Sequence, residues 1–183
     1  MGHEIQSGFA VWITGLPASG KSSITTSLIE HLRQAGIRSV VLESDAMRKL
    51  FPATTYDAKD RDSFYSSLAF IGSVLVQNEI NVLFDATANR REFRDRARAR
   101  IEKFLEVFVD TPLDICMARD PKGIYRKAQT GDLQTVPGLQ AEYEPPLQPD
   151  LVIHGDREDP SVAAMRIIEI LRVRGFISPL LSS

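Results

Sequence analysis

A short glycine-containing segment near the N-terminus has residue types and spacing suited to binding phosphate. Its sequence is Gly15-Leu16-Pro17-Ala18-Ser19-Gly20-Lys21-Ser22, which fills every fixed position of the pattern G-x-x-x-x-G-K-[S/T]. Glycines in such a loop turn successive backbone N–H groups inward, and the following helix directs its positive end at the same phosphates. The lysine then contacts the β- and γ-phosphates, and the serine hydroxyl coordinates Mg²⁺. An accidental glycine-rich turn is the alternative, but the segment lies between an expected strand and an expected helix.

The phosphate loop therefore predicts ATP and Mg²⁺ as cofactors. Lys21 is also expected to be catalytic, because its charge stabilises the phosphoryl group in transfer. The residues expected to bind the nucleotide from this loop are Gly15, Ala18, Ser19, Gly20, Lys21, Ser22 and Ser23. A guanine-selecting Asn-Lys-x-Asp segment is absent from the sequence, so a GTPase is disfavoured.

A carboxylate and an arginine follow the second expected strand, in the run Glu43-Ser44-Asp45-Ala46-Met47-Arg48. Ligands of open α/β sheets bind at the carboxyl ends of the strands, so this turn is expected to face the phosphate loop. Asp45 would accept the proton of an attacking hydroxyl, and Arg48 would bind an anionic acceptor. The alternative is an aspartate that caps a helix beside a solvated arginine.

The third expected strand ends in another carboxylate, Asp85. Its place at the same edge suits a water-mediated contact to Mg²⁺, and a capping role is equally open. Ser22, Glu43 and Asp85 are the candidate metal ligands.

Apolar runs and helical periods predict the elements that would position these residues. Strands are expected at 9–14, 39–42, 81–84, 106–109 and 151–154, and helices at 21–35, 61–78, 89–104 and 160–174. This alternation predicts an α/β protein with the three-layer P-loop NTPase fold, a parallel sheet of about five strands with helices on both faces. Glycines and prolines interrupt the pattern over about 121–149, which predicts a lid within a single domain of residues 1–183.

Composition limits the classes of partner. The chain has 22 Lys and Arg against 24 Asp and Glu, a formal net charge of −2, so no global charge attracts nucleic acid or an anionic membrane. Arginines from Arg90 to Arg100 are interleaved with acids, which favours a solvated helix face with one or two arginines turned to an anionic substrate. The sequence lacks an apolar run long enough to span a membrane, and its first residues do not show the basic-then-apolar pattern expected of a signal peptide. Its single cysteine, Cys116, is expected to be buried and inert, which favours a cytoplasmic protein.

Several runs in the second half of the chain carry a family resemblance. They are Val107-Phe108-Val109-Asp110-Thr111-Pro112-Leu113-Asp114-Ile115-Cys116, Arg119-Asp120-Pro121-Lys122-Gly123-Ile124-Tyr125-Arg126-Lys127-Ala128, Gly131-Asp132-Leu133, Gly138-Leu139 and Tyr143-Glu144-Pro145-Pro146. With the phosphate loop and the Asp45–Arg48 turn, the chain closely resembles the adenylylsulfate (APS) kinases from about Phe9 to Ile153. That family transfers the γ-phosphate of Mg-ATP to the ribose 3′-hydroxyl of APS, giving PAPS, and usually forms dimers. The resemblance implies the same activity, a nucleotide-like small-molecule substrate and a possible homodimer.

The resemblance also implies roles for single residues. Asp45 matches the presumed base, while Arg48 and Arg61 match arginines on the APS side. Tyr56 stands where a phenylalanine stacks on the APS adenine, and Arg119 matches an arginine near the ATP adenine. The residues that match the lid are Lys122, Gly123 and Lys127.

Other positions depart from the family pattern. Phe64 replaces an asparagine that helps hold APS, and it would compensate if its ring entered the pocket as a stacking surface. Val136 replaces the lid aromatic that closes on the adenine. The usual Ile-Ser-Pro-Tyr-Arg after the third strand is Thr87-Ala88-Asn89-Arg90-Arg91 here, with Thr87 expected in the substrate site. These departures leave open another acceptor, such as cytidine diphosphoramidate, and a nucleotide-binding regulatory protein that has lost catalysis.

Overall fold

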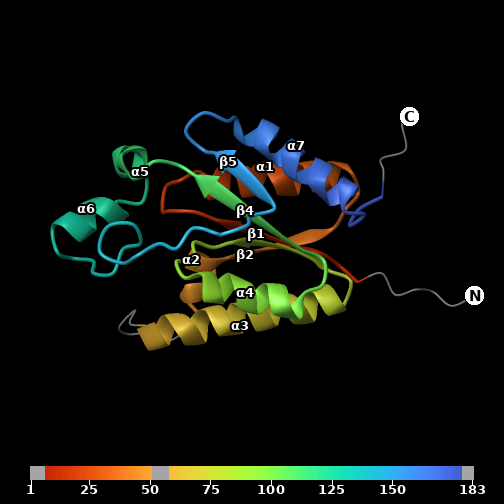
Figure 1. Ribbon diagram of the computed structural model, residues 1–183, viewed down its shortest axis with the longest axis horizontal. Helices are drawn as coiled ribbons and strands as arrows, with labels where there is room; N and C mark the ends of the chain where they lie inside the picture. The colour runs from red at the N-terminus through yellow and green to blue at the C-terminus, as the bar shows by residue number, and fades with distance from the viewer. Residues whose placement is uncertain (1–6, 51–57, 179–183) are drawn as a thin grey trace, which may run out of the picture.

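The protein is built on one five-stranded parallel sheet in a computed structural model that describes residues 7–50 and 58–178 (Figure 1). The strand order is β2-β3-β1-β4-β5, so the strand that leads into the phosphate loop is central. The strands are β1 (Ala10–Thr14), β2 (Ser39–Glu43), β3 (Asn81–Asp85), β4 (Phe104–Asp110) and β5 (Leu151–His154). Because every strand runs in the same direction, all five carboxyl ends meet at one edge.

Helices cover both faces of the sheet (Figure 1). Alternate residues of β1 explain the two layers: Val11 and Ile13 pack towards α1 and α7, while Ala10 and Trp12 pack towards α3 and α4. The helices of these layers are α1 (Lys21–Gln34), α3 (Ala58–Gln77), α4 (Arg91–Arg100) and α7 (Pro160–Val173). Three short helices lie near the carboxyl edge: α2 (Ser44–Arg48), α5 (Leu113–Arg119) and α6 (Ile124–Gln129). The predicted three-layer α/β fold is confirmed.

Local signals explain how the last helix begins and ends. The Asp159 side chain caps α7 by accepting a hydrogen bond from the Ser161 N–H at 2.8 Å, and Pro160 follows the cap as the first helical residue. Gly175, with φ 68°, ends the run as expected.

Two predictions from the sequence differ from the observed elements. The helix expected to extend to Phe104 ends at Arg100, and β4 begins at Phe104, because Phe104 pairs with Ala10 of the central strand and packs near Trp12. The 121–149 segment is less irregular than expected. It contains α6, whose Tyr125 is buried with Cys116 in a small apolar cluster.

Helix α3 lies unusually close to the sheet at Gly72. A Cβ atom there would lie 2.1 Å from the Phe84 ring. That ring is fully buried and stacks on Trp12 with 4.4 Å between the ring centroids, so it has little freedom to move aside. The missing side chain therefore sets the height of α3 above the sheet.

None of the described helices is long and apolar enough to cross a membrane.

Candidate functional site

A cavity of about 690 Å³ opens at the carboxyl edge of the sheet. The phosphate loop, the β2–α2 turn, the end of β3, the start of the 121–149 segment and the β5–α7 loop line it. It therefore gathers most of the expected nucleotide and metal residues. Those that line it are Ala18, Gly20, Lys21, Ser22, Ser23, Glu43, Asp45, Asp85, Thr87, Arg119 and Lys122.

The phosphate loop has the conformation that its glycines predict. Gly20, with φ 109°, leads directly into α1, and a Cβ atom on Gly15 would lie 2.5 Å from the Val109 carbonyl oxygen of β4. Lys21 is buried, and its amine donates hydrogen bonds to the Gly15 and Leu16 carbonyl oxygens at 3.0 and 2.7 Å. Burial lowers the pKa of this lysine, while Asp85 and Asp45 oppose the shift. The Ser19 hydroxyl is buried without a hydrogen-bond partner among the described residues.

Asp85 lies beside the loop because β3 is the neighbour of β1. It pairs with Ile13 on one side and with Glu43 on the other, so both carboxylates stand at the same edge. Burial raises the pKa of Asp85, although Lys21 and a hydrogen bond with Ser22 lower it. Ser22, Glu43 and Asp85 thus form a set of oxygen donors, the ligand type that Mg²⁺ prefers.

Asp45 stands at the opening of the cavity on α2. The Lys122 amine lies 2.7 Å from Asp45 Oδ2 and 3.4 Å from Glu43 Oε1. The hydrogen bond to Asp45 is the main reason why the pKa of Lys122 is raised. The structure therefore brings the expected base and the expected lid lysine into direct contact, with both side chains more than half exposed.

Three arginines, Arg48, Arg61 and Arg90, lie close together and are absent from the residues that line the cavity. The Arg48 guanidinium lies over the Phe64 ring, 4.0 Å from its centroid. Arg61 donates to Asn89 Oδ1 at 3.2 Å and to the Thr135 hydroxyl at 2.7 Å. Burial lowers the pKa of Arg61, and the charges of Arg48 and Arg90 lower it further, so these cations are close together.

Two residues that the sequence placed in the substrate site, Phe64 and Val136, lie elsewhere in the structure. Phe64 is 2% exposed beneath Arg48, so the expectation that its ring enters the pocket as a stacking surface is wrong. Val136 is buried against Tyr125 and Cys116 and is absent from the residues that line the cavity. Lys127 lines a separate, open hollow together with Lys122 and Arg126. Tyr56 lies outside the described residues.

Some site residues were missed at the sequence level. Asp156, Arg157 and Glu158 of the β5–α7 loop line the cavity, and the rule that ligands bind at carboxyl ends of strands is the signal that could have found them. Asp120 is a second example: its carboxylate accepts hydrogen bonds from the Tyr125 and Arg126 N–H groups and fixes the start of α6. Cys116 is buried as expected, and burial raises the pKa of its thiol.

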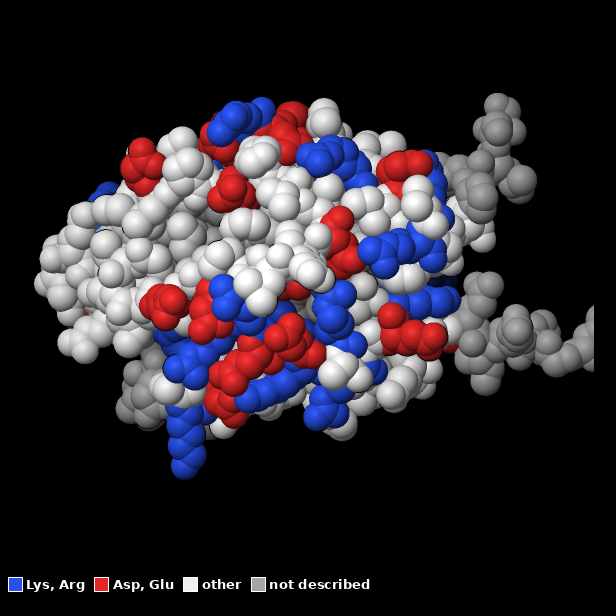
Figure 2. Space-filling model, in the orientation of Figure 1, with Lys and Arg blue, Asp and Glu red and all other residues white. Residues whose placement is uncertain are grey.

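The arginine-rich helix α4 has mixed charge on its outer side. In Figure 2 the Lys and Arg side chains over α4 lie among Asp and Glu side chains, without a continuous basic surface. Arg94 corrects the expectation that the arginines of this helix are either solvated or turned to an anionic substrate. It is 1% exposed and pairs with Glu106 of β4 at 2.7 Å, because Glu106 points inward beneath the helix.

Comparisons with known proteins agree with this geometry. The family model described as adenylylsulphate kinase matches residues 7–154. The adenylyl-sulfate kinase of Rippkaea orientalis is 36% identical over 94% of this chain and 96% of its own, and that of Halothermothrix orenii is 34% identical over 94% of each. The solved APS kinase of Mycobacterium tuberculosis, in complex with AMPPNP and APS, is 34% identical. It covers 90% of this chain and 98% of its own, with a TM-score of 0.85.

Proposed function

The chain belongs to the adenylylsulphate kinase family, and we propose that it transfers the γ-phosphate of Mg-ATP to the 3′-hydroxyl of APS, giving PAPS. One observation supports the proposal above others: a single cavity holds a phosphate loop and, across from it, the Asp45 carboxylate. Members of the family are phosphotransferases with an alcohol group as acceptor, and PAPS formation is a step of sulfate assimilation.

The phosphate loop would bind the triphosphate. Its backbone N–H groups and the start of α1 face the phosphates, and the Lys21 amine would exchange the Gly15 and Leu16 carbonyls for phosphate oxygens. Arg119 and the β5–α7 loop line the end of the cavity where the adenine would lie.

The residues present fit a magnesium ion. Ser22, Glu43 and Asp85 supply hydroxyl and carboxylate oxygens at one edge, and burial of Asp85 leaves its charge poorly compensated. When bound, Mg²⁺ would neutralise charge on the β- and γ-phosphate oxygens.

The chemical step needs a base and an acceptor held in line. The acceptor oxygen forms a bond to the γ-phosphorus as the bond to the β–γ bridging oxygen breaks and ADP leaves. Asp45 accepts the hydroxyl proton, for which its ion pair with Lys122 must open. Lys122 is then free to contact the phosphates.

An anionic, nucleotide-like acceptor fits the group of three arginines described above, which lies outside the cavity lining. Arg48, Arg61 and Arg90 concentrate positive charge there, and such groups bind sulfate and phosphate oxygens well. The relatives compared above carry the adenylyl-sulfate kinase name and give no support to a cytidine acceptor or to a regulatory protein without catalysis. A homodimer remains a prediction from the family resemblance.

The deciding experiment is a comparison of acceptors at fixed Mg-ATP. We expect a kcat/KM for APS of about 10⁴ M⁻¹s⁻¹ or above, in the usual range for enzymes, and far lower values for cytidine nucleotides. A higher kcat/KM for another acceptor would leave only the ATP half of the proposal standing.

A further inference from the structure

Two segments far apart in the sequence meet beside Arg61, which donates to Asn89, and next to Thr87, which lines the cavity. The first is the loop after β3, Thr87–Arg91, and the second is the end of the 121–149 segment, Glu142–Pro145. Four hydrogen bonds join them directly, of 2.9, 2.8, 2.9 and 2.7 Å. They run from Asn89 Nδ2 to the Glu142 carbonyl, from the Glu144 N–H to the Asn89 carbonyl, from the Arg91 N–H to the Glu144 carboxylate, and from Arg91 Nε to the Pro145 carbonyl.

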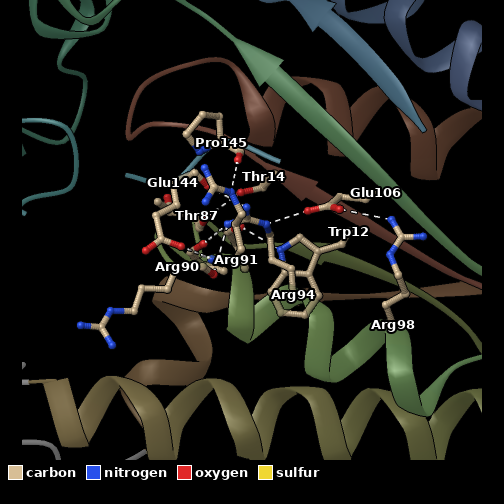
Figure 3. A network of polar contacts seen from close by, with 12 residues as sticks. Trp12, Thr14, Thr87, Arg90, Arg91, Arg94, Arg98, Glu106, Glu144 and Pro145 are labelled. Atoms are coloured by element: carbon tan, nitrogen blue, oxygen red, sulfur yellow. Dashed lines mark hydrogen bonds and ion pairs between the residues drawn. The ribbon is translucent and has the colours of Figure 1, made fainter. Parts of the chain in front are cut away.

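The Arg94 guanidinium ties both segments to the sheet (Figure 3). It donates one hydrogen bond to the Ala88 carbonyl and another, of 2.7 Å, to the Glu144 carbonyl. A third, of 2.7 Å, goes to Glu106 on β4. A planar fork with several donors can reach these three acceptors at once, which a lysine amine on a flexible stem cannot reproduce.

The loop that Arg94 holds has a strained backbone. Ala88 has φ 40°, a conformation that residues with side chains adopt only when their surroundings enforce it. Its N–H donates to the Tyr65 hydroxyl at 3.1 Å, and its carbonyl accepts from Arg94. Thr87, the preceding residue, lines the nucleotide cavity, and its carbonyl accepts a 2.6 Å hydrogen bond from Thr14 of β1.

A buried ion pair contributes little net stability to a fold, because removing both charges from water costs free energy that offsets their attraction. Arg94 and Glu106 are 1% and 8% exposed, and well-packed apolar residues often serve as well in such places. What apolar residues cannot do is fix two backbone carbonyls from different segments in one orientation. The pair is therefore better explained by positioning than by stability.

We propose that Arg94 is a positioning residue for the acceptor, fixing Thr87–Asn89 against Glu142–Pro145 and so setting the positions of Thr87, which lines the cavity, and of Asn89, which accepts a hydrogen bond from Arg61. This inference rests on the proposed kinase function and deepens it. Arg94 is absent from the residues that line the cavity, so it acts through the Ala88 and Glu144 carbonyls. The end of the 121–149 segment is then held in place against the loop after β3, and only the part before Thr135 moves to close over the phosphates.

Arg94→Lys tests the proposal, with Arg98→Lys as its matched control. Both arginines pair with Glu106, but Arg98 is 39% exposed, and it donates to the Glu106 and Asp150 carboxylates rather than to either loop carbonyl. Since a misplacement of about 1 Å can reduce rates about 100-fold, we expect Arg94→Lys to raise KM for APS about tenfold or more. KM for ATP should stay within about twofold. Arg98→Lys should leave both values unchanged.

Amide hydrogen exchange without substrates provides a readout that does not depend on turnover. The Ala88 and Glu144 N–H groups should exchange faster in Arg94→Lys and at the normal rate in Arg98→Lys, while the phosphate loop stays protected in both. If Arg94→Lys does not fold, Glu106→Gln should cause the same changes to a smaller degree, because it loosens the guanidinium and leaves the loop contacts possible.

The outcomes separate the two proposals. A parallel rise in both KM values, or no rise in either, overturns the positioning role, as does unchanged exchange at Ala88 and Glu144. If the wild-type protein does not phosphorylate APS, the proposed function fails, and the exchange rates alone decide whether Arg94 fixes the two segments.

Discussion

Asp45→Asn tests the assignment of the general base. The amide keeps the size of the carboxylate but cannot accept a proton, so kcat should fall by about 10²- to 10⁴-fold. At about 1.4 kcal/mol for each factor of ten, this loss corresponds to about 3 to 5 kcal/mol of transition-state stabilisation.

The fold should be almost unaffected by the same substitution. Asp45 and Lys122 are 55% and 53% exposed, and an exposed ion pair contributes no more than about 1 kcal/mol to stability. KM for ATP should also change little, because the phosphate loop does not depend on this pair. A large fall in kcat without a fall in melting temperature is therefore the expected signature.

Asp85→Asn is the matched comparison, since it removes the carboxylate at the end of β3, which also lines the cavity. Asp85 is 5% exposed and its pKa is raised by burial, so its replacement should stabilise the free protein at neutral pH and weaken the response to Mg²⁺. Initial rates of ADP formation with both substrates saturating, together with thermal unfolding, distinguish the variants. If Asp45→Asn keeps most of its kcat and Asp85→Asn loses it, the base is on β3 and the reasoning is refuted.

Three further predictions concern the loop, the 121–149 segment and Tyr143. Lys21→Ala should abolish measurable phosphoryl transfer and leave the protein folded; near-normal turnover with Mg-ATP would contradict the phosphate-loop assignment. Amide exchange from Lys122 to Gln134 should slow when ATP and APS are both present, as Lys122 leaves Asp45 for phosphate, whereas equal protection in the free protein would indicate a fixed loop. Burial raises the pKa of Tyr143 from 10.0 to about 12, so the folded state holds the phenol in its neutral form. The contribution of Tyr143 to the free energy of unfolding is complete below pH 10 and is lost as the pH rises to about 12. In urea unfolding between pH 10 and 12, the free energy of unfolding should fall by about 2 to 3 kcal/mol less in Tyr143→Phe than in wild type. Equal falls in the two proteins would refute the raised pKa of Tyr143.

The nucleotide half of the site could be predicted because its requirements are local. Eight consecutive residues from Gly15 to Ser22 specify the phosphate loop, and the apolar runs on either side specify the strand and the helix that hold it. The positions of Asp45 and Asp85 near the phosphate loop could be predicted from the fold class, because parallel strands end at one edge of the sheet.

The acceptor half depends on contacts that cross the chain. The sequence shows an aromatic residue at position 64, but only the tertiary structure places Arg48, at the end of α2, over its ring. Arg94 resembles its solvated neighbours on α4 until Glu106, twelve residues further on, is seen to point inward from β4. The predicted boundary between α4 and β4 was wrong for a similar reason. The helical pattern continues to Phe104, but pairing with Ala10 makes Phe104 the first residue of β4.

Gly72 has a consequence for how acceptor preference can diverge. The same continuous helix, α3, carries Gly72 over the Phe84 ring and, nearer its start, Arg61 and Phe64. A side chain at position 72 would lift the helix from the sheet and shift those two residues relative to the phosphate loop. Substrate choice within this fold can therefore evolve through a buried position that no substrate touches.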